Sequence, residues 1–168
     1  MAYVDCKIWR FSDDINNNEK RYKAMKAGHR YYTVKALIDT SSSVNKISKS
    51  LADELGEKYG TRGEYKRMKN SLGYIECLEL SFKYMGKDEL VGQVDEALNR
   101  FEVIKDPKAD LVLGLPWLWL REAEINIQKE GIKIYGDFIP FCKYSPKPKT
   151  SSESDTSESS SSNSNITL

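Results

Sequence analysis

Asp39 is the residue on which a chemical function of this chain most depends. It directly follows the apolar segment Val34–Ile38 and opens a turn of hydroxyl side chains, Thr40 and Ser41–Ser43. The β-branched and aromatic residues from Tyr31 onward favour a buried strand, which would deliver the carboxylate into a tight polar turn. When two carboxylates lie close together, one acts as a base toward water and the other as an acid. The turn offers one such carboxylate, and a paired-acid centre requires two.

The chain supplies this turn once. The later aspartates Asp95, Asp106 and Asp110 precede Glu, Pro and Leu rather than Thr or Ser. The tripeptide recurs at Asp155–Ser157, but in a Ser-rich stretch without an apolar strand. Taken alone, Asp followed by Thr or Ser is most often an ordinary turn that ends a strand. A paired-acid centre would need Asp39 from a second copy of the chain, related by a two-fold axis.

Two short helices are expected around this turn. The spacing of apolar residues predicts an amphipathic helix over Ile47–Leu55, with Ser48 or Ser50 as the N-cap and Gly56 just past its end. Pro116 fits the first turn of a second helix that holds the Trp and Leu residues after it. Trp117, Leu118 and Trp119 of the second helix are expected to pack in the core or at a dimer contact rather than to bind a ligand.

Alternating apolar residues predict the strands that complete the domain. A hairpin is expected from a strand in Ile75–Phe82, a turn at Met85–Lys87 and a return strand over Leu90–Val94. Further strands are expected at Phe101–Ile104 and Leu111–Leu113, and a closing hairpin at Ile125–Ile134.

In this order, the segments resemble a retropepsin-like aspartic protease subunit. The likeness covers Tyr31–Tyr135 and is strongest in Ala36–Ser43, the helix that follows, and Leu111–Trp117. It is most similar to retrotransposon-type members, in which an apolar pair and Gly, then Pro or an acidic residue and an aromatic residue, follow the flap. The resemblance implies a mainly β, small closed barrel-like fold with one or two short helices. It also implies an aspartic endopeptidase that hydrolyses peptide bonds as a homodimer.

The resemblance further implies roles for individual residues. Asp39 would be the catalytic carboxylate, and the Thr40 hydroxyl would brace the facing loop across the dimer. Ser41 and Ser42 would complete the active-site turn. The apolar strand and turn beneath it would be Val112, Leu113 and Gly114, and the substrate-covering flap would lie at Asn70, Ser71, Leu72 and Gly73.

Ser41 departs from the family pattern, which has Gly at this position. If the turn needs a positive φ there, a non-glycine residue costs about 1–2 kcal/mol, and its Cβ also crowds a partner loop. The backbone N–H donor of Ser41 is retained, however. Two functions therefore stay open, an active endopeptidase and a catalytically inactive dimerisation or peptide-binding module of the same fold.

Charge argues against nucleic-acid and membrane partners. Lysine plus arginine number 26 and aspartate plus glutamate 25, so no global field draws the chain onto an anionic surface. The basic stretch Lys58–Lys69 suggests nucleic-acid binding on its own, but it lacks aromatic residues arranged for base stacking on a basic strand face. The expected partners are a second copy of the chain and a peptide or protein substrate.

The sequence calls for neither a metal nor an organic cofactor. Cys6, Cys77 and Cys142 are widely spaced, and His29 is the single histidine, in a charged stretch typical of the surface. The first residues lack the apolar run of a signal peptide, and no apolar stretch of about 18 residues is present to span a bilayer. The expected location is the cytoplasm, with the nucleus as the alternative.

Composition divides the chain into three parts. Residues 1–28 are expected to form an N-terminal extension, and residues 29–144 the retropepsin-like domain. Residues 145–168 lack the core residues that would offset chain entropy, so this Ser- and Glu-rich tail is expected to be disordered.

Overall fold

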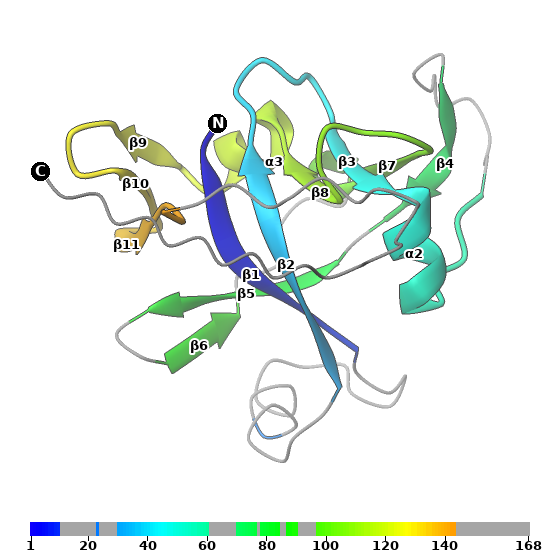
Figure 1. The fold of residues 1–168 in the computed structure, drawn as a ribbon, viewed down its shortest axis with the longest axis horizontal. Coiled ribbons are helices and arrows are strands. Elements are labelled where there is room, and N and C mark those ends of the chain that lie inside the picture. Colours follow the sequence, from blue (N-terminus) through cyan, green and yellow to red (C-terminus); the bar gives the residue numbers. More distant parts are fainter. Residues whose placement is uncertain are drawn as a thin grey trace, which may run out of the picture.

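The computed structural model describes residues 1–10, 23, 30–60, 70–76, 78–84, 87–90 and 97–143. The fold is mainly β with short helices, as expected (Figure 1). Its helical elements are α2 (Lys49–Leu55), α3 (Leu115–Leu120) and a 3₁₀ turn, η1 (Ala97–Asn99). Its strands are β1 (Tyr3–Trp9), β2 (Tyr31–Ile38), β3 (Asn45–Ser48), β4 (Ser71–Ile75), β5 (Glu79–Tyr84), β6 (Lys87–Leu90), β7 (Phe101–Ile104), β8 (Leu111–Leu113), β9 (Glu124–Asn126), β10 (Gly131–Ile134) and β11 (Asp137–Pro140).

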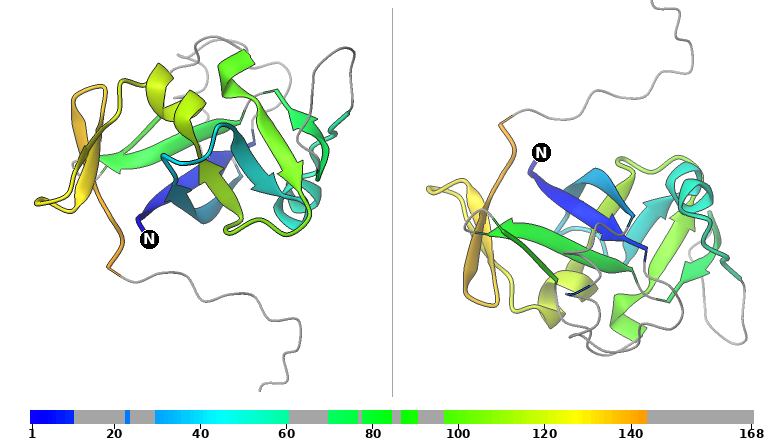
Figure 2. Two further views of the ribbon diagram at one scale, coloured as in Figure 1. Left: turned by 90° about the horizontal axis from the view of Figure 1, so that it is seen from above. Right: turned by 90° about the horizontal axis from the view of Figure 1, so that it is seen from below.

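One large sheet dominates the fold. Its strand order is β4-β7-β3-β8-β2-β1-β5-β6, and β9, β10 and β11 form a second, antiparallel sheet at one side of the molecule (Figure 2). Within the large sheet, β2 runs antiparallel to β1 and parallel to β8, and β3 runs parallel to β7. The strand that leads to Asp39 therefore lies in the interior of the sheet, paired on both sides.

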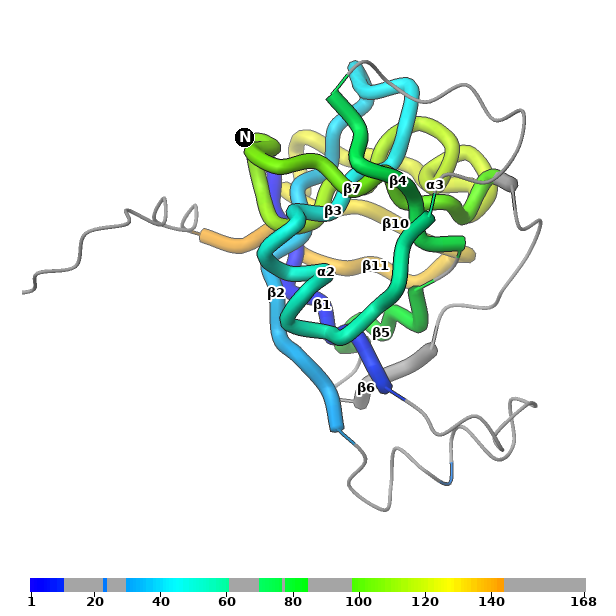
Figure 3. The backbone as a smooth tube through the Cα atoms, turned by 90° about the vertical axis from the view of Figure 1, so that its right-hand side faces the viewer, coloured from blue at the N-terminus to red at the C-terminus, as the bar shows by residue number. Residues whose placement is uncertain are grey.

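The expected closed barrel is not formed. The edge strands β4 and β6 do not pair with each other in the described part of the chain, and β4 lies beside β7 in the upper part of Figure 3. A sheet closes only when strand tilt and stagger bring its two edges together. Here α3 and the second sheet cover the open side of the core through Trp117, Leu118, Ile132, Ile134 and Ile139. The core is enclosed although the sheet is open.

The beginning of the chain belongs to this sheet. β1 pairs along its whole length with β2, from Tyr3 opposite Leu37 to Trp9 opposite Tyr31, and it also pairs with β5. The alternating side chains of Val4, Cys6 and Ile8 are buried in the main core. This strand lies within residues 1–28, which the sequence analysis assigns to an extension, so that stretch starts with a strand of the domain's own sheet.

The helix expected over Ile47–Leu55 begins later, at Lys49. Asn45–Ser48 instead forms β3, because its backbone is paired between β7 and β8. Ser48 is the N-cap, with its hydroxyl accepting a hydrogen bond from the Leu51 N–H at 3.0 Å, and Gly56 ends the helix with a left-handed φ of 74°. The expected caps are therefore confirmed, and the predicted start of the helix, Ile47, was wrong because Ile47 and Ser48 belong to β3.

The expected hairpins are present. β5 and β6 pair with Tyr84 opposite Lys87, and β9 pairs with β10. The expected first strand, Ile75–Phe82, is divided, because Ile75 ends β4 and β5 begins at Glu79. The return strand begins at Lys87 rather than at Leu90, and residues 91–94 of the expected strand lie outside the described residues. The strand β11 was not expected, since Phe138 and Ile139 provide too short an apolar pattern before Pro140. It pairs with β10 through a turn in which Tyr135 has a φ of 50° and Gly136 a φ of 88°.

Several expectations concern residues that the structure does not describe. These are the surface position of His29, the free thiol of Cys77 and the disordered tail at residues 145–168. No helix within the described ranges combines the length and the apolar character needed to cross a membrane.

Candidate functional site

Asp39 lies where β2 ends against β8. The parallel register places Ile38 opposite Leu113, and the Asp39 N–H donates a hydrogen bond to the Leu113 carbonyl at 3.1 Å. The Ser42 N–H then donates to the Asp39 carbonyl at 3.2 Å and closes the turn. The Asp39 side chain is only 13% exposed. The backbone that carries the carboxylate is thus fixed by contacts with two segments, the turn itself and β8, which lie far apart in the sequence.

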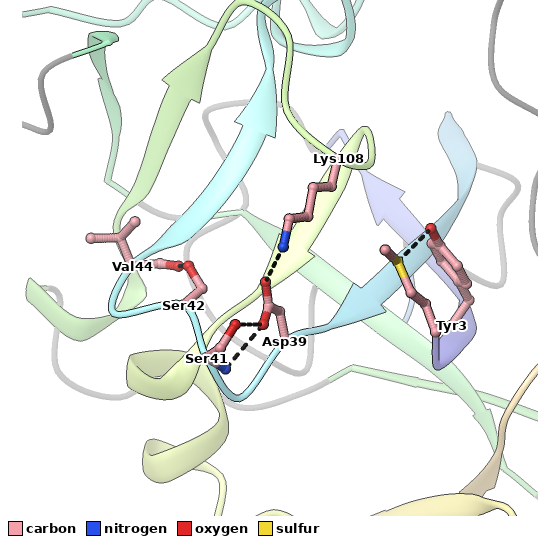
Figure 4. Close-up of polar contacts among 7 residues, drawn as sticks. Tyr3, Asp39, Ser41, Ser42, Val44 and Lys108 are labelled. Atoms are coloured by element: carbon pink, nitrogen blue, oxygen red, sulfur yellow. Dashed lines mark hydrogen bonds and ion pairs between the residues drawn. The ribbon is translucent and has the colours of Figure 1, made fainter.

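The two oxygens of this carboxylate have different partners (Figure 4). Oδ1 accepts hydrogen bonds from the Ser41 hydroxyl at 2.5 Å and from the Ser41 N–H at 3.0 Å. Oδ2 lies 4.0 Å from Nζ of Lys108, which comes from the loop between β7 and β8. One oxygen is therefore bound within the turn, and the other faces a cation.

These contacts favour the charged form of Asp39. Its pKa lies below the usual carboxyl range, primarily because the Ser41 hydroxyl stabilises the carboxylate. Burial acts in the opposite direction, while the Ser41 N–H and the charges of Lys108 and Lys46 lower the pKa further. In the single chain, Asp39 is thus an ionised group.

Ser41 occupies its position without backbone strain. Positive φ values at non-glycine residues occur, within the described ranges, at Glu122, Glu130 and Tyr135, and not at Ser41. The cost foreseen for a left-handed serine therefore does not arise. Its side chain is exposed, so the effect of its bulk depends on what faces the turn.

Gly114 is required by the contact between this turn and the start of α3. A Cβ at Gly114 would lie 2.2 Å from the Val44 carbonyl oxygen and 2.9 Å from that of Ser42. The neighbouring Leu115 N–H donates to the Ser42 carbonyl at 2.9 Å. Because real Cβ atoms do not approach backbone oxygens so closely, any side chain here would push the turn away. The glycine therefore sets how close β8 comes to the turn.

Asn45 is a supporting residue that the sequence analysis missed. Its buried side-chain oxygen accepts from the Gly114 and Trp117 N–H groups, both at 3.1 Å, and its nitrogen donates to the Leu98 and Arg100 carbonyls, both at 3.0 Å. The only sequence signal is an Asn next to the apolar Ile47 strand pattern. Its amide fixes α3 and the turn after η1 to β3.

The other predicted turn residues lie beside Asp39. Ser42 is buried, and its hydroxyl donates to the Val44 carbonyl at 2.7 Å. Thr40 is exposed and borders a cavity of about 390 Å³ lined mainly by apolar side chains of α3 and β9. Val112 and Leu113 are buried in β8, and their role in supporting the turn stays a prediction.

The predicted flap residues occupy an edge strand of the same sheet. β4 contains Ser71, Leu72 and Gly73, directly after Asn70, and it pairs with β7. The Ser71 hydroxyl donates to the carboxylate of the buried Glu102 at 2.5 Å. In the sheet order, β7, β3 and β8 separate β4 from β2, so the flap role stays a prediction.

The described residues do not gather three metal-ligating His, Cys, Asp or Glu side chains at one place. The chemistry available at the site is that of Asp39 with its hydroxyl, amide and lysine neighbours.

Comparisons with known proteins concern the fold. The sequence matches no family model and no curated protein sequence. The structure, however, is similar to the crystal structure of the retroviral protease-like domain of Ddi1 from Leishmania major, with a TM-score of 0.59 and 20% sequence identity. The similarity covers 88% of this chain and 98% of that chain. The chain therefore has a retropepsin-like fold.

Proposed function

We propose that the chain is an aspartic endopeptidase of retropepsin type, in which Asp39 from two copies forms one catalytic centre. The observation that carries the proposal is the position of Asp39, 13% exposed and held by Ser41 at the end of β2. A carboxylate fixed and shielded in this way is suited to acid–base chemistry rather than to a solvated turn. Since the chain supplies this turn once, the second carboxylate comes from a second copy.

The mechanism uses one proton shared by two Asp39 carboxyl groups. The charged carboxylate removes a proton from a water molecule, which adds to the peptide carbonyl, while the protonated carboxyl donates to the carbonyl oxygen. The tetrahedral diol then collapses, and a proton passes to the leaving nitrogen. This sequence of steps requires neither a metal nor an organic cofactor.

An apolar surface beside the turn supports the homodimer. The cavity next to Thr40 is lined by the buried Leu118 and by three exposed residues, Leu115, Trp119 and Ile125, of which Trp119 is 74% exposed. Contiguous exposed apolar side chains of this kind are typical of interaction sites. Thr40, the residue after Asp39, borders this surface. A dimer in which a two-fold axis brings two Asp39 side chains together would therefore bury the apolar surface.

The Ser41 hydroxyl favours a second candidate function, a catalytically inactive module for dimerisation or peptide binding. It donates to Oδ1 of Asp39 at 2.5 Å and stabilises the charged carboxylate. A pair of carboxyl groups that shares one proton needs one of them in the neutral form. A strong donor on each carboxylate opposes that state.

Peptide cleavage by the full-length protein tests the first proposal. We expect hydrolysis of members of a diverse peptide library with a bell-shaped pH dependence, inhibition by a statine-type transition-state analogue, and loss of activity on Asp39→Asn. Sedimentation velocity with and without the analogue measures the dimer. A folded dimer that neither cleaves the library nor binds the analogue rejects the endopeptidase.

Substituting Ser41 distinguishes the two candidates. If Ser41→Gly creates proteolysis that the parent lacks, the inactive module is supported. If the parent already cleaves peptides, the inactive module is rejected.

A further inference from the structure

One lysine lies beside Asp39 and a second acts on it from a neighbouring part of the sheet, and neither is accounted for by the acid–base role of Asp39. Lys108 places Nζ 4.0 Å from Oδ2 of Asp39 and is itself 61% exposed (Figure 4). Lys46 also acts electrostatically on Asp39. The first lysine comes from the loop before β8 and the second from β3, so two separate elements direct positive charge to the same carboxylate.

The strand register places Lys46 on the Asp39 side of the sheet. Its neighbours Asn45 and Ile47 are buried on the core side, so Lys46 points to the opposite face. On that face Lys46 is opposite Val112, which is opposite Leu37 of β2. Leu37 precedes Asp39 by two residues. Residues two apart in an extended chain point to the same face of the sheet. Lys46, Val112 and Leu37 thus form a row that leads to the carboxylate.

Within the described residues, the acidic side chains near this row do not occupy the ammonium groups of Lys46 and Lys108. Among the described residues, Lys108 forms an ion pair with Asp39 alone, and Lys46 forms none. Glu102 is next to Lys46 in the register, but it is buried and bonded to Ser71. Asp110 accepts from the Ser48 hydroxyl at 2.8 Å, and the exposed Asp106 forms no ion pair with Lys108.

Pairing two chains increases the positive charge of the site. Two carboxyl groups that share a proton carry one negative charge, whereas each chain adds both lysines. The field between two such surfaces therefore favours anionic ligands. On the basis of the proposed function, we infer that the site selects peptides that carry acidic side chains next to the scissile bond, with Lys46 and Lys108 as the specificity-determining residues.

Binding of non-cleavable peptides tests this inference separately from catalysis. Three fluorescent peptides share one hydroxyethylene isostere in place of the scissile bond and differ only in flanking Glu, Gln or Lys residues. We expect the wild-type protein to bind the Glu peptide at least about fivefold more tightly than the Gln peptide, and the Lys peptide most weakly. The double substitution Lys46→Met and Lys108→Met should remove this order. Lys133→Met, an exposed lysine of β10, is the matched control and should keep it.

The outcomes separate the two proposals. Equal binding of the three peptides overturns the inference about acidic substrates and leaves the endopeptidase standing. Binding of none of them, together with no cleavage of the library, overturns both. A single-stranded oligonucleotide that displaces the Glu peptide as well as unlabelled Glu peptide does would show a general anion surface and would also overturn the inference. Circular dichroism of each variant confirms that it is folded.

Discussion

The hydroxyl and the backbone N–H of Ser41 donate to the same oxygen of Asp39, Oδ1, at 2.5 Å and 3.0 Å. Serine at this position therefore retains the amide donor and adds a second donor that glycine lacks. The backbone of Ser41 is not strained, so the physical effect of the residue is on the charge state of Asp39.

Ser41→Ala should raise the pKa of Asp39, because it removes the largest contribution that lowers it. A lowered folded-state pKa contributes stability above the unfolded pKa, and this stability is lost as the pH falls through the folded pKa. The variant should lose that contribution at higher pH than the parent. Carbon-13 NMR titration of Asp39 and denaturant unfolding at several acidic pH values measure the shift. Ser43→Ala, in the same turn, is the control, and equal titration of both variants would contradict the assignment.

Gly114→Ala should destabilise the fold by about 1–3 kcal/mol, the cost of overpacking against atoms that cannot move freely. The added methyl would meet the Val44 carbonyl oxygen at 2.2 Å. Urea unfolding monitored by tryptophan fluorescence gives the change. Gly60→Ala is the control, because a Cβ there meets nothing within 4 Å. Similar free energies of unfolding for the two variants would contradict the close approach of Gly114 to the Val44 carbonyl oxygen.

Asn45→Ala should cost at least about 3 kcal/mol, since it leaves two buried N–H groups and two carbonyls without the amide that satisfies them. Chemical denaturation measures the loss. Asn126→Ala removes a single exposed turn bond to the Lys129 N–H and should cost below about 1 kcal/mol. If both substitutions cost the same, Asn45 does not act as the link between β3 and α3.

Trp119→Ala should weaken a dimer about tenfold or more while leaving the unfolding of the monomer nearly unchanged. Its side chain is 74% exposed in the single chain and borders the cavity next to Thr40, and buried aromatic residues dominate interface energies. Sedimentation equilibrium gives the dissociation constant. Tyr31→Ala, an exposed aromatic at the opposite end of β2, is the control. Equal dissociation constants for the parent and Trp119→Ala would place the dimer contact elsewhere.

The elements with a clear periodicity of apolar residues or a clear capping residue were predictable from the sequence. The apolar run before Asp39, the strand ending at Gly114 and the proline that starts α3 each carry a local signal that depends on neighbours in the chain. Side-chain alternation and capping residues act over a few positions, so a linear reading finds them. The retropepsin-like fold was predictable because these signals occur in a specific order.

The tertiary structure alone decided how distant segments meet. The place of β1 within the sheet, the four bonds of Asn45, the approach of Lys108 to Asp39 and the open edges β4 and β6 all join residues separated by long stretches of chain. A long-range hydrogen bond or ion pair leaves no periodic pattern in the sequence, because its partners are chosen by packing and register rather than by spacing. The sequence by itself determined which carboxylate enters the turn, and packing determined which charges surround it.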